Sequence, residues 1–134
     1  MSCRAIWFIF IIVGCGNQNS SFNLNGSWVL TIMEGEAINF KDDMKIPMLE
    51  FQVEDTSVTG RAFCNSIRGS YEMSDEEIKF SAFAGTRMTC PDQVLEDTFL
   101  RLFERIKKYK ISNSELSLFD SNQSELLRFR KTDQ

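Results

Sequence analysis

The chain has 134 residues, of which 43% are apolar and 25% are charged, and both values are typical of a single globular domain. It contains no histidine, which excludes a serine–histidine–acid triad and every zinc site that uses a histidine ligand. Its net charge of −4 argues against a nucleic-acid partner, because proteins that bind the phosphate backbone are normally basic.

Residues 1–14 are typical of a secretory signal peptide. Arg4 supplies a positive charge, and residues 5–13 form an apolar run that is too short for a transmembrane helix of roughly 20 residues. The run leads into the sequence IVGC, which ends at Cys15 and resembles the lipobox of bacterial lipoproteins. The resemblance implies that Cys15 is lipidated and anchors the mature chain to a membrane through several acyl chains. An ordinary signal peptide with a chance cysteine and an uncleaved membrane anchor are the alternatives.

Residues 15–21 are polar and lack hydrophobic periodicity, so we expect a flexible tether between the anchor and a domain that spans residues 22–134. The residue after Cys15 is Gly16, not the aspartate that retains some bacterial lipoproteins in the inner membrane. We therefore expect a lipid-anchored protein of the cell envelope, attached to the outer membrane and facing the periplasm.

Alternating apolar and polar residues predict five strands in the first two thirds of the chain. The predicted strands cover residues 26–33, 48–54, 58–63, 69–73 and 78–83. The second has the clearest period of two, because Leu49, Phe51 and Val53 are separated by glutamate and glutamine. Short polar turns join the second strand to the third and the fourth to the fifth, which indicates two hairpins.

A helix of about four turns is predicted to follow these strands. Thr89 or Cys90 can serve as the N-cap, and Pro91 can occupy the first turn, where its missing N–H costs nothing. Asp92 and Glu96 lie near the positive end of the helix dipole. The apolar residues of the helix form a single stripe that consists of Leu95, Phe99, Leu102, Phe103 and Ile106.

Three more short strands are predicted at residues 108–112, 115–119 and 126–130. The order of five strands, one helix and three strands has no βαβ alternation, which argues against a parallel sheet. About eight short antiparallel strands can close, or nearly close, into a small barrel with the helix over an open end. The predicted fold class is therefore mainly β (α+β), a small cracked antiparallel barrel with one inserted helix. An open α+β sandwich is the alternative.

The cysteines divide by position. Cys3 would leave with the signal peptide and Cys15 would carry lipid, so Cys64 and Cys90 remain. In an oxidising compartment a remaining pair indicates a disulfide. Free buried thiols and redox or metal chemistry are the alternatives, but there is no CxxC spacing, and two thiolates without histidine make a poor metal site. We expect no metal and no cofactor.

Several short motifs resemble those of the META domain family, which is also called HslJ-like. The motifs are Asn25 to Leu30, Gly60, Cys64-Asn65 with Gly69 to Tyr71, Thr86-Arg87-Met88-Thr89-Cys90-Pro91, Tyr109 to Ile111 and Leu116 to Phe119. The resemblance covers roughly residues 22–131, and the run from Thr86 to Pro91 is its most specific part. One departure is Phe63, which stands where the family often has a glycine before the Cys-Asn pair.

The resemblance implies a lipocalin-like cracked barrel with an inserted helix. It strengthens the prediction of a disulfide between Cys64 and Cys90, because many family members have cysteines at these places. Members are bacterial envelope proteins tied to stress and antibiotic resistance, and no catalytic activity is established for the family. We therefore expect a non-enzymatic envelope lipoprotein that interacts with an unidentified envelope protein in stress or antibiotic tolerance. A carrier that holds a small apolar ligand or lipid in its barrel is the alternative.

Independent of the family, the residues offer little chemistry. The carboxylates cluster in turns and on the polar face of one strand, which is typical of a solvated surface rather than an active site. Arg87 is the polar residue with the most specific position, inside the motif before the helix. We expect it to be a structural hydrogen-bonding group near the helix start, and binding of an anionic partner is the alternative.

Overall fold

The computed structural model describes residues 24–39 and 45–132 of the chain. The predicted signal peptide, Cys15 and the tether lie outside these residues. The helix is α2 (Gln93–Arg105). The strands are β1 (Gly26–Met33), β2 (Glu36–Ala37), β3 (Met48–Gln52), β4 (Ser57–Arg61), β5 (Ser66–Met73), β6 (Ile78–Phe80), β7 (Ala84–Gly85), β8 (Lys108–Ser112), β9 (Glu115–Phe119) and β10 (Glu125–Lys131).

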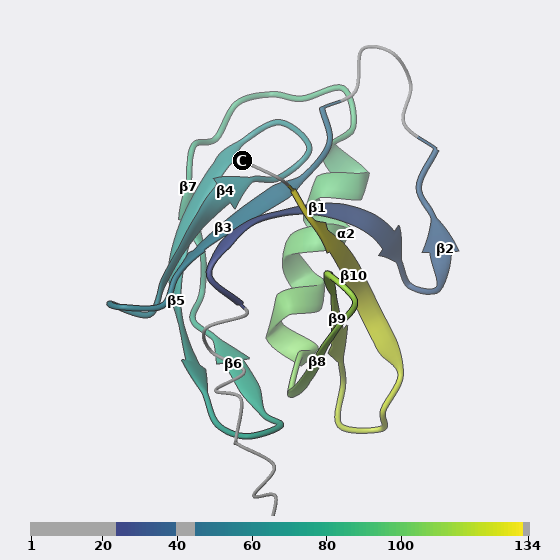
Figure 1. The fold of residues 1–134 in the computed structure, drawn as a ribbon. Helices are drawn as coiled ribbons and strands as arrows, with labels where there is room; N and C mark the ends of the chain where they lie inside the picture. The colour runs from purple at the N-terminus through teal and green to yellow at the C-terminus, as the bar shows by residue number, and fades with distance from the viewer. Residues whose placement is uncertain (1–23, 40–44, 133–134) are drawn as a thin grey trace, which may run out of the picture.

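The strands form an antiparallel sheet that curls into a nearly closed barrel (Figure 1). Neighbouring strands follow the order β6-β5-β4-β3-β1-β10-β9-β8, while β2 pairs with β1 and β7 pairs with β5. The two ends of this order meet at a bridge between Glu77 and Lys108. Beside this bridge, the Ile78 N–H donates a hydrogen bond to the Lys107 carbonyl at 3.1 Å. The predicted cracked barrel of about eight strands with one helix is confirmed, in preference to the open sandwich.

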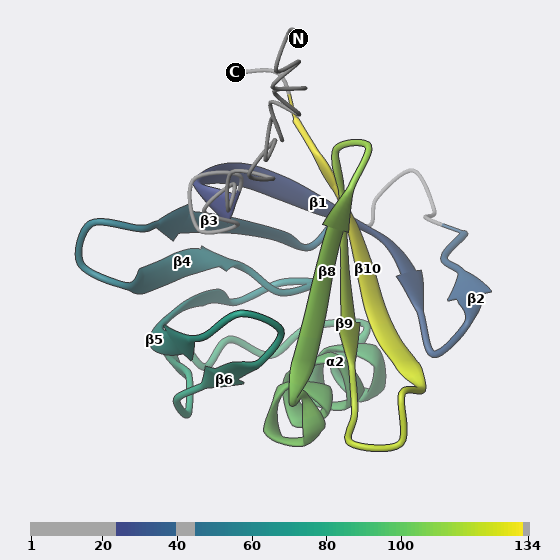
Figure 2. The same cartoon turned by 60° about the horizontal axis from the view of Figure 1, so that its bottom comes forward.

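Helix α2 occupies the part of the barrel where β6 and β8 do not pair. Both views place it between the side formed by β5 and β6 and the side formed by β8, β9 and β10 (Figures 1 and 2). Phe99, Leu102 and Phe103 are buried, as is Ile106 directly after the helix, and Leu95 is half-buried. The predicted apolar stripe therefore faces the barrel interior. No helix among residues 24–39 and 45–132 combines the length and apolar character needed to cross a bilayer.

The start of α2 differs from the prediction. The helix begins at Gln93 with Asp92 as its N-cap, and no side-chain hydrogen bond caps it, so the prediction of Thr89 or Cys90 as the N-cap is wrong. The physical reason is that the Asn65 side chain binds the Met88 N–H and a disulfide holds Cys90. These contacts keep the chain before Pro91 out of helical geometry.

The regular strands follow from the alternation in the sequence. In β3, Leu49 and Phe51 are buried while Glu50 and Gln52 are exposed, as a strand with one face on the core requires. Opposite Leu49 in β4 stands Gly60. A Cβ atom there would lie 2.1 Å from the Met48 carbonyl oxygen, so the two strands can approach this closely only with glycine at that position.

Two predicted strand boundaries are wrong by three residues and several others by one or two, and two short strands were not predicted. The strand predicted at residues 78–83 ends at Phe80, and a separate strand, β7, pairs with Ile67 and Arg68 of β5. β5 starts earlier than predicted, at Ser66. β2 and β7 have two residues each, which is too short for any periodicity to predict.

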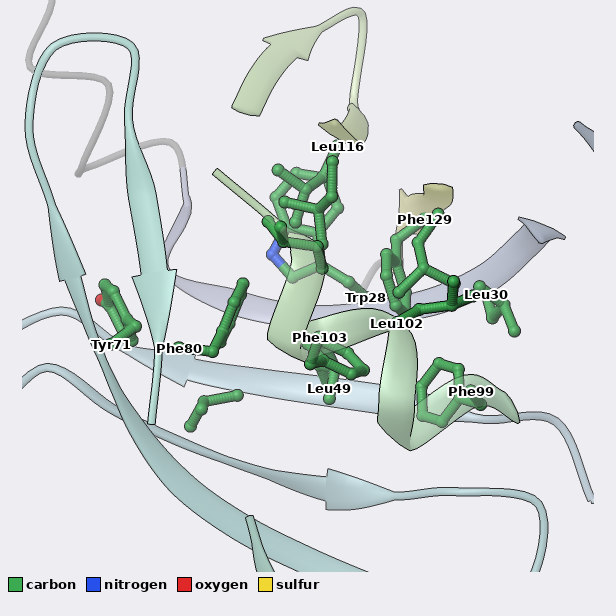
Figure 3. Packing of buried hydrophobic residues seen from close by; sticks show 14 of the residues in the cluster. Trp28, Leu30, Leu49, Tyr71, Phe80, Phe99, Leu102, Phe103, Leu116 and Phe129 are labelled. Atoms are coloured by element: carbon green, nitrogen blue, oxygen red, sulfur yellow. The ribbon is translucent and has the colours of Figure 1, made fainter. Parts of the chain in front are cut away.

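The barrel interior is filled by side chains of the strands and of α2, as Figure 3 shows for the labelled residues. Trp28 is fully buried, and its indole N–H donates to the Leu24 carbonyl at 2.7 Å, so its polar atom is satisfied. Phe103 of α2 packs edge-on against Phe80 at 5.0 Å between ring centroids. Such a pair contributes about 0.5–1.5 kcal/mol beyond its buried area. Phe99 makes a similar edge contact with Phe63, so this departure from the family pattern adds to the core.

Two tyrosines of the barrel differ in how their hydroxyl groups are satisfied. The Tyr71 hydroxyl oxygen is buried and finds no hydrogen-bond partner among the described residues. Burial raises the pKa of Tyr71, and the charge of Asp55 adds to this effect. The Tyr109 hydroxyl instead donates toward the carbonyls of Ser74 and Asp75, both at 3.1 Å.

We predict that Tyr71→Phe leaves the free energy of unfolding at pH 7 unchanged or raises it by about 1 kcal/mol, because it removes a buried hydroxyl without a partner. The raised pKa means that the folded state keeps the phenol proton longer than the unfolded chain does. Stability therefore falls as pH rises above about 10, and this loss is smaller in Tyr71→Phe. Urea unfolding at pH 7, 9 and 11 measures both effects.

Tyr109→Phe is the matched control, since it removes a hydroxyl that is hydrogen-bonded. It should lower the free energy of unfolding at pH 7 by about 1 kcal/mol. The interpretation of Tyr71 is contradicted if the two variants lose equal stability at pH 7, or if Tyr71→Phe follows the wild-type protein between pH 9 and pH 11.

Candidate functional site

A cleft of about 650 Å³ opens between α2 and the chain that leads into it. In Figure 1 this chain runs from β6 along β5 to the top of the view and then crosses to the start of the helix. We call residues 86–91 the motif loop, since they are the Thr-Arg-Met-Thr-Cys-Pro run of the sequence. The lining residues include Thr86 to Cys90 of this loop, Gln93 and Asp97 on the helix, and Asn65. The most specific motif of the sequence therefore forms one wall of the cleft.

A buried carboxylate lies behind the cleft. Glu96, in the first turn of α2, is only 1% exposed. One of its carboxylate oxygens accepts hydrogen bonds from the backbone N–H groups of Cys64 and Asn65, at 3.0 and 2.8 Å. The other accepts from the Asn65 side-chain amide. Three N–H donors and the positive end of the helix dipole compensate the cost of removing this carboxylate from water.

Asn65 connects the buried Glu96 carboxylate to the motif loop through hydrogen bonds. Its side chain is buried, and its carbonyl oxygen accepts from the Met88 N–H at 2.7 Å and from the Thr86 hydroxyl at 2.9 Å. The Thr86 hydroxyl oxygen in turn accepts from the Ser66 N–H at 3.1 Å. The turn before β5 and the motif loop are therefore held together by side-chain hydrogen bonds at two successive points.

A disulfide makes the same connection covalent. Cys64 and Cys90 form a disulfide, with a Cα–Cα distance of 6.0 Å. This confirms the predicted pairing over the alternatives of free buried thiols and of a redox or metal site. The bridge joins the residue before Asn65 to the last residue of the loop before Pro91. The loop is thus fixed at Thr86, Met88 and Cys90, while the residues between them remain exposed.

Arg87 takes no part in these contacts. It is exposed, and its side chain makes no hydrogen bond or ion pair with any residue in the described ranges. Asn65 and Glu96 fill the structural role that the sequence suggested for Arg87. Binding of an anionic group by Arg87 stays a prediction. Met88 is also exposed, at 52%, so the loop presents one cationic and one apolar side chain at the rim of the cleft.

Sequence reasoning missed Glu96 and Asn65 as the centre of this site. A signal was present for Glu96, because it lies three residues before Phe99 and seven before Phe103, on the buried face of the helix. A glutamate on an apolar stripe requires a buried partner. The identity of that partner depends on the turn around Asn65, which local sequence does not fix.

The cleft holds no arrangement that points to catalysis. No group of three or more cysteine, aspartate or glutamate side chains lies together as a metal site in the part of the chain that the structure describes. Glu96 is enclosed by donors that belong to the scaffold, so its oxygens are not available to a ligand.

The structure therefore defines a class of protein, a small and nearly closed antiparallel barrel with one helix in its crack. In this protein the motif loop before the helix borders a cleft. The family model of the META domain matches residues 21–133, and the chain belongs to the META domain family. This confirms the resemblance seen in the sequence. Neither the META domain nor this barrel fold is known as enzymatic.

Solved structures share the fold. An NMR structure of a protein from Burkholderia xenovorans is 23% identical, with a TM-score of 0.68, over 87% of this chain and 88% of that chain. A second NMR structure is 21% identical, with a TM-score of 0.61, over 80% and 89% of the two chains. A crystal structure of a DUF4847 family protein from Bacteroides vulgatus is 13% identical, with a TM-score of 0.58, over 87% and 99%. At these identities the likeness shows the fold alone, and no curated protein matches the sequence.

We predict that Glu96→Gln lowers the free energy of unfolding by about 1–3 kcal/mol, because its amide would direct N–H groups at donors that now meet a carboxylate. Denaturant unfolding of the oxidised protein measures this loss. Glu104→Gln is the matched control, since Glu104 is exposed on the same helix, and it should change stability by less than about 0.5 kcal/mol. Equal effects of the two substitutions would show that the buried network contributes nothing.

Proposed function

We propose that this protein is a non-enzymatic lipoprotein of the bacterial cell envelope that binds a protein partner through the surface around its motif loop, in a response to stress or antibiotics. The observation that carries the proposal is that some atoms of the motif loop are bonded to the barrel while other side chains of the loop are exposed to solvent. Thr86, the Met88 N–H and Cys90 are fixed to the barrel, and the side chains of Arg87 and Met88 are exposed. A surface held rigid before binding loses little conformational entropy on association.

The filled barrel supports a binding surface over a ligand carrier. The interior positions near α2 are occupied by large side chains, among them Trp28, Phe99 and Phe129, each less than 2% exposed. A barrel of about eight strands has room for its own side chains or for one small ligand. The cleft beside α2, in contrast, opens to solvent and is bordered by Met88 and Arg87.

Exposed apolar side chains near the cleft also support a partner site. Met88 is 52% exposed and Val94, in the first turn of α2, is 79% exposed. Methionine adapts its shape to different partners, which makes it frequent at binding surfaces. Methionine and arginine, the two exposed side chains of the motif loop, are both enriched at protein interfaces.

The partner is tested by photo-cross-linking in the living cell. We predict that a photoreactive phenylalanine analogue at position 88 forms a discrete adduct with another protein, while the same analogue at position 59, an exposed site on β4, does not. Equal labelling from both positions, or none from position 88, would contradict the proposal. A stoichiometric apolar molecule that remains with the delipidated protein in native mass spectrometry would favour the carrier function instead.

The anchor is tested separately. We predict that the wild-type protein incorporates radioactive palmitate and fractionates with the outer membrane, and that Cys15→Ala abolishes the labelling because the acceptor sulfur is gone. Cys3→Ala is the matched control and should label normally. Unchanged labelling of Cys15→Ala would refute the lipoprotein part of the proposal.

A further inference from the structure

Within residues 24–39 and 45–132, strand β7 pairs along one edge only, and its other edge lies beside the cleft. On one side it pairs with β5, where Gly85 stands opposite Ile67 and Ala84 opposite Arg68. The Thr86 N–H continues this pairing and donates to the Ser66 carbonyl at 3.1 Å. The Met88 N–H points the same way and donates to Asn65.

Backbone groups of successive residues in a strand point to opposite sides. The Thr86 N–H is directed toward β5, so the Gly85 N–H of β7 is directed away from β5. Residues 86–88 lie beyond β7, and there the Met88 N–H turns to the Asn65 side chain. The Arg87 N–H makes no hydrogen bond with any described residue. An edge with free donors and acceptors at alternate residues is a template for another extended chain.

Two clefts border this edge. The 650 Å³ cleft adjoins a second cleft of about 240 Å³, and both are lined by Phe83 and Leu100. Together they follow the segment from Ser81 to Met88, which contains β7. Gly85 has no side chain to fill the space above Ile67, and a Cβ there would lie 2.5 Å from the Ser66 carbonyl oxygen.

The chemistry of the occupant follows from the larger cleft, because Arg101 and Glu104 in the lining of the smaller cleft have opposite charges. Arg87 is the cation in the lining of the larger cleft and has no ion pair among the residues described. Asp97 on the opposite wall accepts a hydrogen bond from the Gln93 side chain at 2.9 Å. An acidic group is therefore complementary to the strand wall, while Phe83 and Leu100 are complementary to an apolar side chain.

We propose that this groove, between β7 and α2, binds an extended peptide segment of the partner, which adds to the free edge of β7 as a further strand. An apolar side chain of the segment packs against Leu100 above Gly85, and an acidic side chain pairs with Arg87. Main-chain hydrogen bonds give affinity and the two pockets give specificity, as in other cases of strand addition. This inference rests on the proposed function and names the element of the partner that is bound.

The experiment uses protein purified as the producing cell processes it, in mild detergent, and a displayed library of random twelve-residue peptides as the probe. We expect the enriched peptides to share an acidic residue and an apolar residue in an alternating pattern. In NMR hydrogen exchange, a bound peptide should slow the Gly85 and Arg87 amides at least tenfold. The Thr86 and Met88 amides, which are already hydrogen-bonded, should change little and serve as internal controls.

Two further measurements test the geometry and the charge. N-methylation of alternate peptide amides should weaken binding about tenfold, with little effect at the amides between them, because only every second N–H of an added strand meets β7. Arg87→Glu should weaken binding about tenfold. Arg130→Glu, which makes the same charge change at an exposed site on β10, should not.

The inference is overturned if no peptide is enriched, if enriched peptides bind without protecting the Gly85 and Arg87 amides, or if they bind as helices. In each of these cases the in-cell cross-link from position 88 still decides the proposed function by itself. A cross-link without strand addition would retain the partner and reject the mode of binding. Loss of both would reject the proposed function as well.

Discussion

The carboxylate of Glu96 is the interaction on which the rest of the site depends. It is buried in the first turn of α2 and accepts three hydrogen bonds from Cys64 and Asn65. A buried charge is costly unless it is hydrogen-bonded, so the helix can occupy the crack of the barrel only with the turn around Asn65 in this one conformation. The helix position and the turn therefore specify each other.

Apolar packing alone would not fix the helix so closely. Phe99, Leu102 and Phe103 provide a stripe of large side chains that any apolar surface would accept, and hydrophobic burial has no direction. Hydrogen bonds do have a direction, and the bonds to Glu96 fix the rotation of the helix about its axis and its position in the crack. The apolar stripe supplies most of the stabilisation. The carboxylate selects one position of the helix among those that the stripe permits.

The sequence predicts the elements that depend on local periodicity. The spacing of apolar residues predicts both β3, through residues such as Leu49, and the stripe of α2, through residues such as Phe99. The sequence also predicts the barrel and the Cys64–Cys90 bridge. The features that were not predicted depend on contacts far apart in the chain. The helix starts at Gln93 because Asn65 and the disulfide hold the preceding residues, and β7 exists because β5 lies beside it. No local pattern encodes either contact.

The motif loop also explains why a specific sequence signature does not by itself reveal a ligand. Thr86, Cys90 and the backbone of Met88 bond to the barrel, and Gly85 is required by the close approach of Ser66. Most of the signature therefore encodes the shape of the loop rather than its contacts with a partner. The proposed partner would then be selected by the exposed side chains of Arg87 and Met88 and by neighbouring positions of α2 that line the cleft, such as Gln93, Asp97 and Leu100. These helix positions lie outside the signature. Gln93 and Asp97 are exposed, whereas Leu100 is half-buried against the core, so the first two are the positions where the surface of the cleft can change without disturbing the barrel.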